Sequence, residues 1–148
     1  MERNAHMEHM IALGRKVLAS QPFSTLLDAE LVGLSAGRAE LKIPIRAELK
    51  QQHGFVHGGV LSYAADNALT FAGGSALGSG VVTSEFKINY FRPALGDFIV
   101  ARATVIYSGK TQAVCRCDVY VVEGENERLC AAAQGTITRL GQASSSAA

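Results

Sequence analysis

The sequence predicts an α+β fold in which an antiparallel sheet of about six strands wraps around one long buried helix, with a short helix at the N-terminus. Three observations favour it. The chain has 148 residues, which is enough for one domain with a real core. Residues 58–77 are apolar on nearly every side of a helical wheel, and the other segments mostly read as strands between turns. We therefore expect residues 1–148 to form a single domain.

The first elements expected are a helix and a hairpin. Apolar residues recur at helical spacing over residues 7–19, and this pattern ends near Ser20-Gln21-Pro22. Apolar and charged residues then alternate over residues 38–43, which is typical of a half-buried strand. Residues 25–33 are its expected hairpin partner, with a turn at Ser35-Ala36-Gly37.

The central helix is expected over residues 58–77. Its many alanines would let a sheet approach closely, and its apolar character all round indicates a buried helix rather than a surface one. Gly73-Gly74 and then Gly78-Ser79-Gly80 are expected to end it.

The rest of the chain predicts four antiparallel strands followed by a flexible tail at residues 141–148. Tight-turn residues separate the last three strands, and the tail is small and polar. The expected strands are residues 83–91, 97–107, 111–122 and 127–140.

Composition and charge exclude several classes of protein. The net charge of +1 argues against nucleic acid or a membrane surface as the main partner. No apolar run approaches the roughly 18 residues that a membrane span requires, and the first twenty residues lack a signal-peptide core. Cys115, Cys117 and Cys130 are expected to be reduced core thiols, which favours a cytoplasmic location.

Asp66 is the unusual residue of the central helix, because a charged and unpaired carboxylate in a dry core would cost several kcal/mol. Gly58, at the start of the helix, offers an unpaired backbone N–H at the positive end of the helix dipole. Such a group suits a carbonyl oxygen that gains charge during attack. The two residues lie eight positions apart, about 12 Å along one helix, so we expect them to cooperate across a two-fold axis between two chains.

Three motifs resemble those of the hotdog-fold acyl-CoA thioesterases, specifically the PaaI-like branch, over roughly residues 24–140. The first is "GFVHGG", with Asp66 seven residues after the second glycine of its final pair, Gly59. The second is "TSEFKINYFRPA" on the strand after the helix, and the third is "SGKT" at a later turn. Their combination with the order of elements makes the resemblance specific.

The resemblance implies a role for each of several residues. Gly58 would polarise the thioester carbonyl, and Asp66 would act as the nucleophile or as a general base on water. Thr83 takes the place of a hydroxyl residue that helps to position water, and Gln51 that of an asparagine. Thr83 has the opposite strand parity from Phe86, so it reaches the site only if a bulge or bend intervenes.

The resemblance also bears on substrate binding and assembly. The phosphates of CoA need donors, for which the candidates are Arg92 and the Ser108-Gly109-Lys110 turn. His57 is a weaker candidate for a base than for a residue that shapes its loop. We expect a homodimer with composite sites, pairing into a tetramer as a dimer of dimers. We expect no metal, since His53 and His57 lack a third ligand of recognisable spacing, and no cofactor beyond the CoA of the substrate.

The leading hypothesis is hydrolysis of an aryl- or medium-chain acyl-CoA to the free acid and CoA. Two alternatives stay open, because a fold does not determine a function. One is a hotdog dehydratase or hydratase acting on acyl thioesters through His57 or His53. The other is a non-catalytic acyl-CoA-binding module. The sequence does not distinguish the acyl groups from one another, and it favours CoA over acyl carrier protein only slightly.

Overall fold

The computed structural model describes residues 1–78 and 80–141. Ser79 and residues 142–148, which make up most of the expected tail, lie outside the described residues. The elements along the chain are α1 (Glu2–Ala19), α2 (Pro22–Leu26), β1 (Glu30–Ser35), β2 (Arg38–Pro44), the 3-10 helix η1 (Ala47–Leu49), α3 (Gly58–Leu77), β3 (Val81–Tyr90), β4 (Phe98–Ser108), β5 (Gln112–Glu123) and β6 (Asn126–Arg139).

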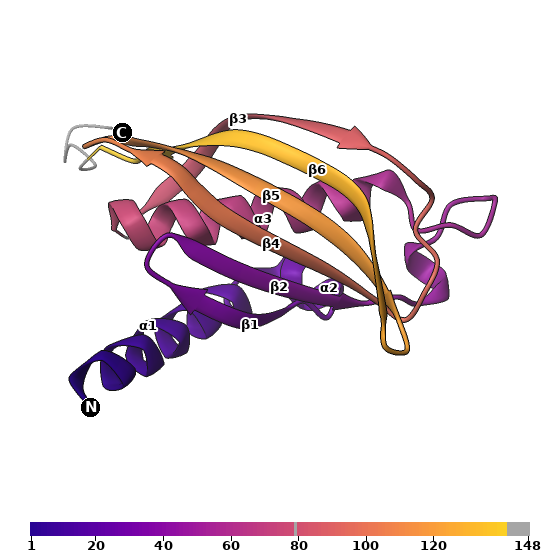
Figure 1. Cartoon of the computed structure of the whole chain (residues 1–148), viewed down its shortest axis with the longest axis horizontal. Helices are drawn as coiled ribbons and strands as arrows, with labels where there is room; N and C mark the ends of the chain where they lie inside the picture. The colour runs from indigo at the N-terminus through magenta and orange to yellow at the C-terminus, as the bar shows by residue number, and fades with distance from the viewer. Residues whose placement is uncertain (79, 142–148) are drawn as a thin grey trace.

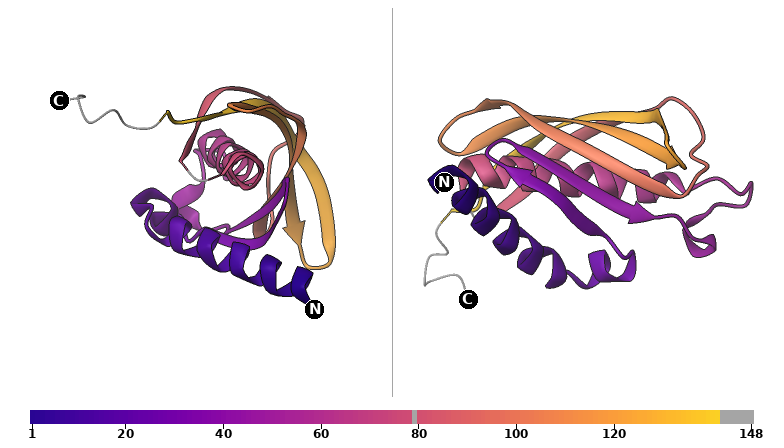
Figure 2. Two further views of the ribbon diagram at one scale, coloured as in Figure 1. Left: turned by 90° about the vertical axis from the view of Figure 1, so that its left-hand side faces the viewer. Right: turned by 60° about the horizontal axis from the view of Figure 1, so that its bottom comes forward.

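The strands of the described part of the chain form one six-stranded sheet, in the order β1-β2-β4-β5-β6-β3. Every neighbouring pair is antiparallel. The sheet curves around α3 (Figure 1), and α1 lies across the open side of this curve, near β1 (Figure 2). This is the predicted hotdog architecture, an antiparallel sheet around one long buried helix with a further helix at the N-terminus. The strand β3 forms one edge of the sheet.

The central helix has the predicted bounds and the predicted burial. Ala64, Ala65, Ala68 and Ala72 are fully buried against the sheet. Gly73-Gly74 do not interrupt the helix as expected, whereas Gly78 ends it as expected, with a φ of 98°. Gly73 has a packing role instead: a Cβ there would lie 2.7 Å from the Cβ of Ile137 on β6.

The N-terminal region differs from its prediction in two respects. The first helix begins at Glu2 rather than at residue 7, and residues 25–26 belong to α2 rather than to a strand. Pro22 occupies the first turn of α2, where its missing N–H costs nothing. Ser24, also on α2, is buried and hydrogen-bonded, so tertiary contacts support a helix of only one turn.

The described residues agree with the expected state of the cysteines. Cys115, Cys117 and Cys130 are free and buried, and burial raises the pKa of Cys115 to about 11. Their thiols are therefore protonated at neutral pH and behave as small apolar groups. None of the helices in residues 1–78 and 80–141 is long and apolar enough to span a membrane.

Candidate active site

His57 caps the N-terminus of α3. Its Nδ1 accepts a hydrogen bond from the Gly59 N–H at 2.8 Å, and its carbonyl oxygen accepts one from the Val60 N–H at 2.9 Å. A neutral imidazole whose Nδ1 is an acceptor carries its proton on Nε2. The ring therefore satisfies one of the donors that the start of a helix leaves unpaired, and this is the loop-shaping role considered for it above.

Gly58 lies beside the cap, at the first position of the helix. Its N–H has no acceptor among residues 1–78 and 80–141, whereas its carbonyl oxygen accepts a hydrogen bond from the Tyr90 hydroxyl at 3.1 Å. Gly58 lines a cleft of about 320 Å³ between the start of α3 and the end of β3. Gln51 and Arg92 line the same cleft, so the structure brings three of the predicted residues together.

The loop before α3 uses the Gln51 side chain to hold its own shape. The Gln51 Oε1 accepts a hydrogen bond from the His53 N–H at 2.5 Å, and the Gln51 N–H donates to the Phe55 carbonyl at 2.8 Å. The acceptor of the Gln51 amide is thus occupied within the loop. Its NH2 group is the half that has donors to offer to a ligand.

Asp66 lies near the middle of α3 and is half-buried. Its Oδ1 accepts a hydrogen bond from the Thr83 hydroxyl at 2.6 Å. The Thr70 hydroxyl donates to the Asp66 carbonyl at 2.8 Å and lies 3.0 Å from the Thr83 hydroxyl. Neither a cation for this carboxylate nor a hydrogen-bond partner for Oδ2 is present in the described residues.

A β-bulge turns Thr83 toward Asp66. On β3, Thr83 pairs with Ile137 and Glu85 with Thr136, so Ser84 is an extra residue between two consecutive partners. The extra residue reverses the alternation along β3, and Thr83 is half-buried like Phe86 although their numbers differ in parity. The bend that the Thr83 assignment required is therefore present.

Gly135 on β6 is what lets the strands approach at this bulge. A Cβ at residue 135 would lie 2.6 Å from the Phe86 Cβ and 2.7 Å from the Glu85 carbonyl oxygen. Real Cβ atoms do not approach backbone so closely, and the Glu85 oxygen cannot move without disturbing the ladder. The position of Thr83 thus depends on a glycine more than fifty residues further along the chain.

The two polar neighbours nearest to Asp66 in sequence bind elsewhere. The Asn67 Nδ2 donates to the Tyr63 hydroxyl at 2.9 Å and to the Gln21 Oε1 at 3.2 Å. The Tyr63 hydroxyl donates to Ser24 Oγ, and Ser24 donates to Gln21. Burial raises the pKa of Tyr63, although its hydrogen bonds with Ser24 and Asn67 oppose the change. This polar network fixes the α1–α2 junction on α3 and leaves Asp66 without those partners.

The sequence reasoning missed this polar network. One signal was available, since Tyr63 and Asn67 lie four residues apart and therefore on one face of the helix. The other two members are Gln21, which caps α2, and Ser24 on α2, a helix that the sequence reasoning did not predict.

The other predicted phosphate contacts lie apart from the cleft. Ser108, Gly109 and Lys110 form the exposed turn between β4 and β5, which the Gly109 N–H closes by donating to the Gln112 carbonyl at 2.8 Å. In Figure 1 this turn lies beside the C-terminal end of α3, whereas the cleft that holds Gly58 lies at its N-terminal end. Within one chain, Arg92 and Lys110 are therefore at opposite ends of the helix. No group of three or more His, Cys, Asp or Glu side chains in the described residues is placed to hold a metal ion.

Comparison with known proteins identifies the family. Residues 53–127 match the Thioesterase superfamily. The chain is 29% identical over 116 residues to the acyl-coenzyme A thioesterase PaaI of Escherichia coli, a match that covers 78% of this chain and 80% of that protein.

Two solved structures agree with this assignment. A thioesterase family protein from Silicibacter pomeroyi superposes with a TM-score of 0.82 at 35% identity, covering 86% of this chain and 96% of that one. A mutant of the phenylacetic acid degradation protein PaaI from Thermus thermophilus gives a TM-score of 0.71 at 31% identity, covering 81% of this chain and 100% of that one. The chain thus belongs to the thioesterase superfamily, as a PaaI-like member with the hotdog fold, and is a thioester hydrolase.

Proposed function

We propose that the protein hydrolyses acyl-CoA thioesters with an aryl or medium-chain acyl group, releasing the free acid and CoA at a site built from two subunits. The observation that carries the proposal is the state of Asp66. Its carboxylate is held by the Thr83 hydroxyl at one oxygen, whereas the described residues offer neither a cation to it nor a partner to the other oxygen. A carboxylate held in this way can take a proton or attack a carbonyl carbon.

A second subunit is needed to bring Asp66 to the cleft. Gly58 and Asp66 are eight residues apart on one helix, about 12 Å along its axis. The edge strand β3 has a free side in the single chain. Pairing β3 with its own copy about a two-fold axis makes the two strands, and the two α3 helices, antiparallel. Asp66 of one chain then comes toward Gly58 of the partner subunit.

The same two-fold axis would reunite the candidate phosphate contacts. The β4–β5 turn and the Gly58 cleft lie at opposite ends of α3, so reversal of the second chain places the turn of one subunit near the cleft of the other (Figure 1). Arg92 from one chain and the Ser108-Gly109-Lys110 turn from the other would then both face the CoA phosphates. We extend the proposal to a tetramer made of two such dimers and to a cytoplasmic location.

In the proposed reaction the thioester carbonyl oxygen accepts a hydrogen bond from the free Gly58 N–H, which stabilises the negative charge that develops there. The free Asp66 oxygen takes a proton from a water molecule, whose oxygen bonds to the thioester carbon. The C–S bond then breaks, and the CoA thiolate leaves and gains a proton. Direct attack by the same Asp66 oxygen is the other route that this geometry allows. His57 contributes by fixing the Gly58–Gly59 backbone, and no cofactor takes part.

The hydratase alternative is disfavoured by the hydrogen bonds of His57. A histidine base needs a free ring nitrogen and an acid to orient it. The Nδ1 of His57 is an acceptor for the Gly59 N–H, and the part of the chain that the structure describes offers no carboxylate bound to its ring.

The first test compares the wild type with Asp66→Asn, which keeps the shape of the side chain and removes its charge. Release of free thiol from a panel of acyl-CoAs should fall by roughly 10²–10⁴-fold. Binding of a non-hydrolysable thioether analogue should change little. If neither protein releases thiol but both bind the analogue, hydrolysis is wrong and the binding module is favoured. Equal turnover by both proteins would remove Asp66 from the mechanism.

A second pair of variants tests the Gly58 N–H. Gly58→Pro removes this N–H at the first helical position, where proline is favoured, and His57 already has a φ of −59° and a ψ of 134°, in the polyproline II region that suits a residue before proline. Turnover should fall by about 10²–10³-fold. Gly58→Ala is the control, since it keeps the N–H and its Cβ would lie an ordinary 3.5 Å from the Tyr90 ring. An equal loss in both variants would contradict the role of the N–H.

A further inference from the structure

A groove of about 480 Å³ runs between α1 and α3. Its walls are mostly apolar, and they include Leu13 and Val17 from α1 together with Phe71 from α3. Leu13 and Val17 are 49% and 52% exposed, so both leave apolar surface open on the groove wall. A pocket of a few hundred Å³ with apolar walls and a few polar groups is what a small-molecule site normally offers.

The groove reaches the polar cluster around Asp66. Thr70 and Asn67, both on α3, line the groove. The Thr70 hydroxyl donates to the Asp66 carbonyl at 2.8 Å and lies 3.0 Å from the Thr83 hydroxyl, which itself binds the Asp66 carboxylate. One wall of the groove is therefore part of the hydrogen-bonded group that orients Asp66.

The α1 wall is fixed rather than loosely attached. Gly14 is buried, and a Cβ there would lie 2.7 Å from the Leu31 side chain on β1, so α1 packs closely on this strand; the Phe71 ring on α3 would lie at an ordinary contact distance of 3.7 Å. The Arg15 Nε donates to the Leu31 carbonyl at 3.0 Å. At the end of α1, the Gln21 amide joins the buried network with Asn67. A rigid wall can discriminate between ligands by size.

We infer that the groove between α1 and α3 holds the acyl group, and that Leu13 and Val17 determine which acyl groups are accepted. The inference rests on the proposed function, because it names the part of the substrate that extends from the thioester carbon at Asp66. An acyl group with an apolar body, either an aryl ring or a chain of several methylenes, would cover the exposed faces of these two side chains. A short acyl group such as propionyl would end before it reached them.

The test places a charge on the groove wall and measures acyl preference. Leu13→Asp replaces an apolar side chain of the groove wall with a charged one. Burial of one methylene is worth about a fourfold change in binding, so lost contact with several methylenes should reduce kcat/KM for octanoyl-CoA relative to propionyl-CoA by about tenfold or more. Leu13→Met, which stays apolar and similar in volume, should keep the wild-type ratio of kcat/KM for octanoyl-CoA over propionyl-CoA.

Leu26→Asp is the matched control. Leu26 on α2 is also an exposed leucine, at 64%, and it does not line the groove. Its substitution should change the octanoyl-to-propionyl ratio by less than about twofold. Thermal melting of each variant establishes that the fold is retained. If Leu13→Asp and Leu26→Asp change the ratio equally, or if Leu13→Asp alters the oligomeric state but not the ratio, the inference is wrong.

A binding measurement separates this inference from the proposed function. Dissociation constants are measured for thioether analogues of propionyl- and octanoyl-CoA, with CoA itself as the baseline. If the wild type hydrolyses nothing but binds the octanoyl analogue more tightly than the propionyl one, and Leu13→Asp abolishes this difference, the groove stands and the hydrolysis is wrong. If turnover depends on Asp66 but the variant leaves the affinity difference intact, the hydrolysis stands and the groove is wrong. If no analogue binds, both are wrong.

Discussion

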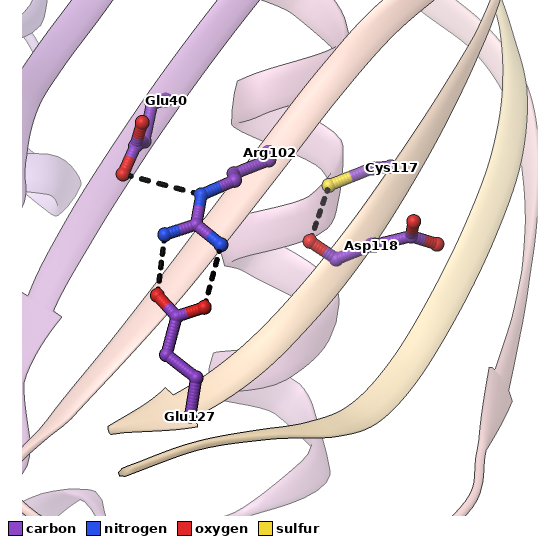
Figure 3. Close-up of polar contacts among 5 residues, drawn as sticks. All are labelled: Glu40, Arg102, Cys117, Asp118 and Glu127. Carbon is purple, nitrogen blue, oxygen red and sulfur yellow. Dashed lines mark hydrogen bonds and ion pairs between the residues drawn. The ribbon is translucent and has the colours of Figure 1, made fainter. Parts of the chain in front are cut away.

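Asp66 and Glu127 are two carboxylates, one half-buried and one exposed, whose hydrogen-bond partners differ completely. Glu127 on β6 receives both terminal nitrogens of Arg102 on β4: the Nη1 donates to Oε2 at 2.9 Å, and the Nη2 donates to Oε1. The Nε of the same guanidinium lies 3.4 Å from the Glu40 Oε1 on β2 (Figure 3). Among the residues that the structure describes, Asp66 has a single neutral donor, the Thr83 hydroxyl.

The partners determine what each carboxylate can do. The hydrogen bond from Arg102 holds the pKa of Glu127 below its usual value, and Glu127 in turn raises the pKa of Arg102. Because both Glu127 oxygens bind a guanidinium, neither is available to take a proton from a substrate or from water. Asp66 keeps one oxygen free. The number and charge of the hydrogen-bond donors therefore distinguish the two carboxylates.

A substitution at Thr83 sharpens the comparison most. Thr83→Val keeps the volume and branching of the side chain and removes the hydroxyl that orients Asp66. A hydrogen bond to a charged group is worth about 1.5–3 kcal/mol, so kcat should fall by roughly 10- to 100-fold if the contact acts in the transition state. The measurement is thiol release at saturating acyl-CoA, with KM determined alongside.

Thr136→Val is the matched control for this prediction. The Thr136 hydroxyl donates to the Glu85 Oε1 at 2.5 Å, so the same type of bond is removed one residue along β6 from Ile137, the partner of Thr83. Its loss should leave kcat within about twofold. If Thr83→Val instead raises KM and leaves kcat unchanged, Thr83 is a binding residue.

The sequence was sufficient to predict the parts of the fold that rest on local pattern. Residues 58–77 form the buried helix because their apolar side chains cover every side, and alternation located the strands. α2 was not predicted, since a helix of one turn depends on contacts such as that between Ser24 and Tyr63 rather than on its own pattern. Tertiary contacts overrode local preference there.

The candidate site also has parts that follow from local sequence and parts that depend on tertiary contacts. The motif that contains Gly58 and Asp66 is local and could be recognised. The position of Thr83 depends on a bulge at Ser84, and the bulge depends on Gly135, which approaches only once β6 has paired with β3. Single-strand parity therefore placed Thr83 on the wrong side. The partners of Asn67 and Tyr63 come from a segment about forty residues earlier, which sequence spacing does not connect to them.

The smallest expected effect belongs to Glu127→Gln. The pKa of Glu127 is lowered from its usual 4.5 in the folded protein, so its pairing with Arg102 stabilises the fold above that value and is lost as the pH falls through the lowered folded-state pKa. The pair is exposed, with side-chain accessibilities of 40% and 39%, and its removal should cost less than about 1 kcal/mol at pH 7. Urea unfolding at pH 7 should show this difference in the free energy of unfolding between wild type and variant. At a pH well below the usual carboxyl range, the difference should disappear. Thiol release at pH 7 should equal that of the wild type. A variant that kept its stability but lost turnover would mean that a carboxylate bound through both oxygens still serves the reaction, and the distinction drawn between Glu127 and Asp66 would fail.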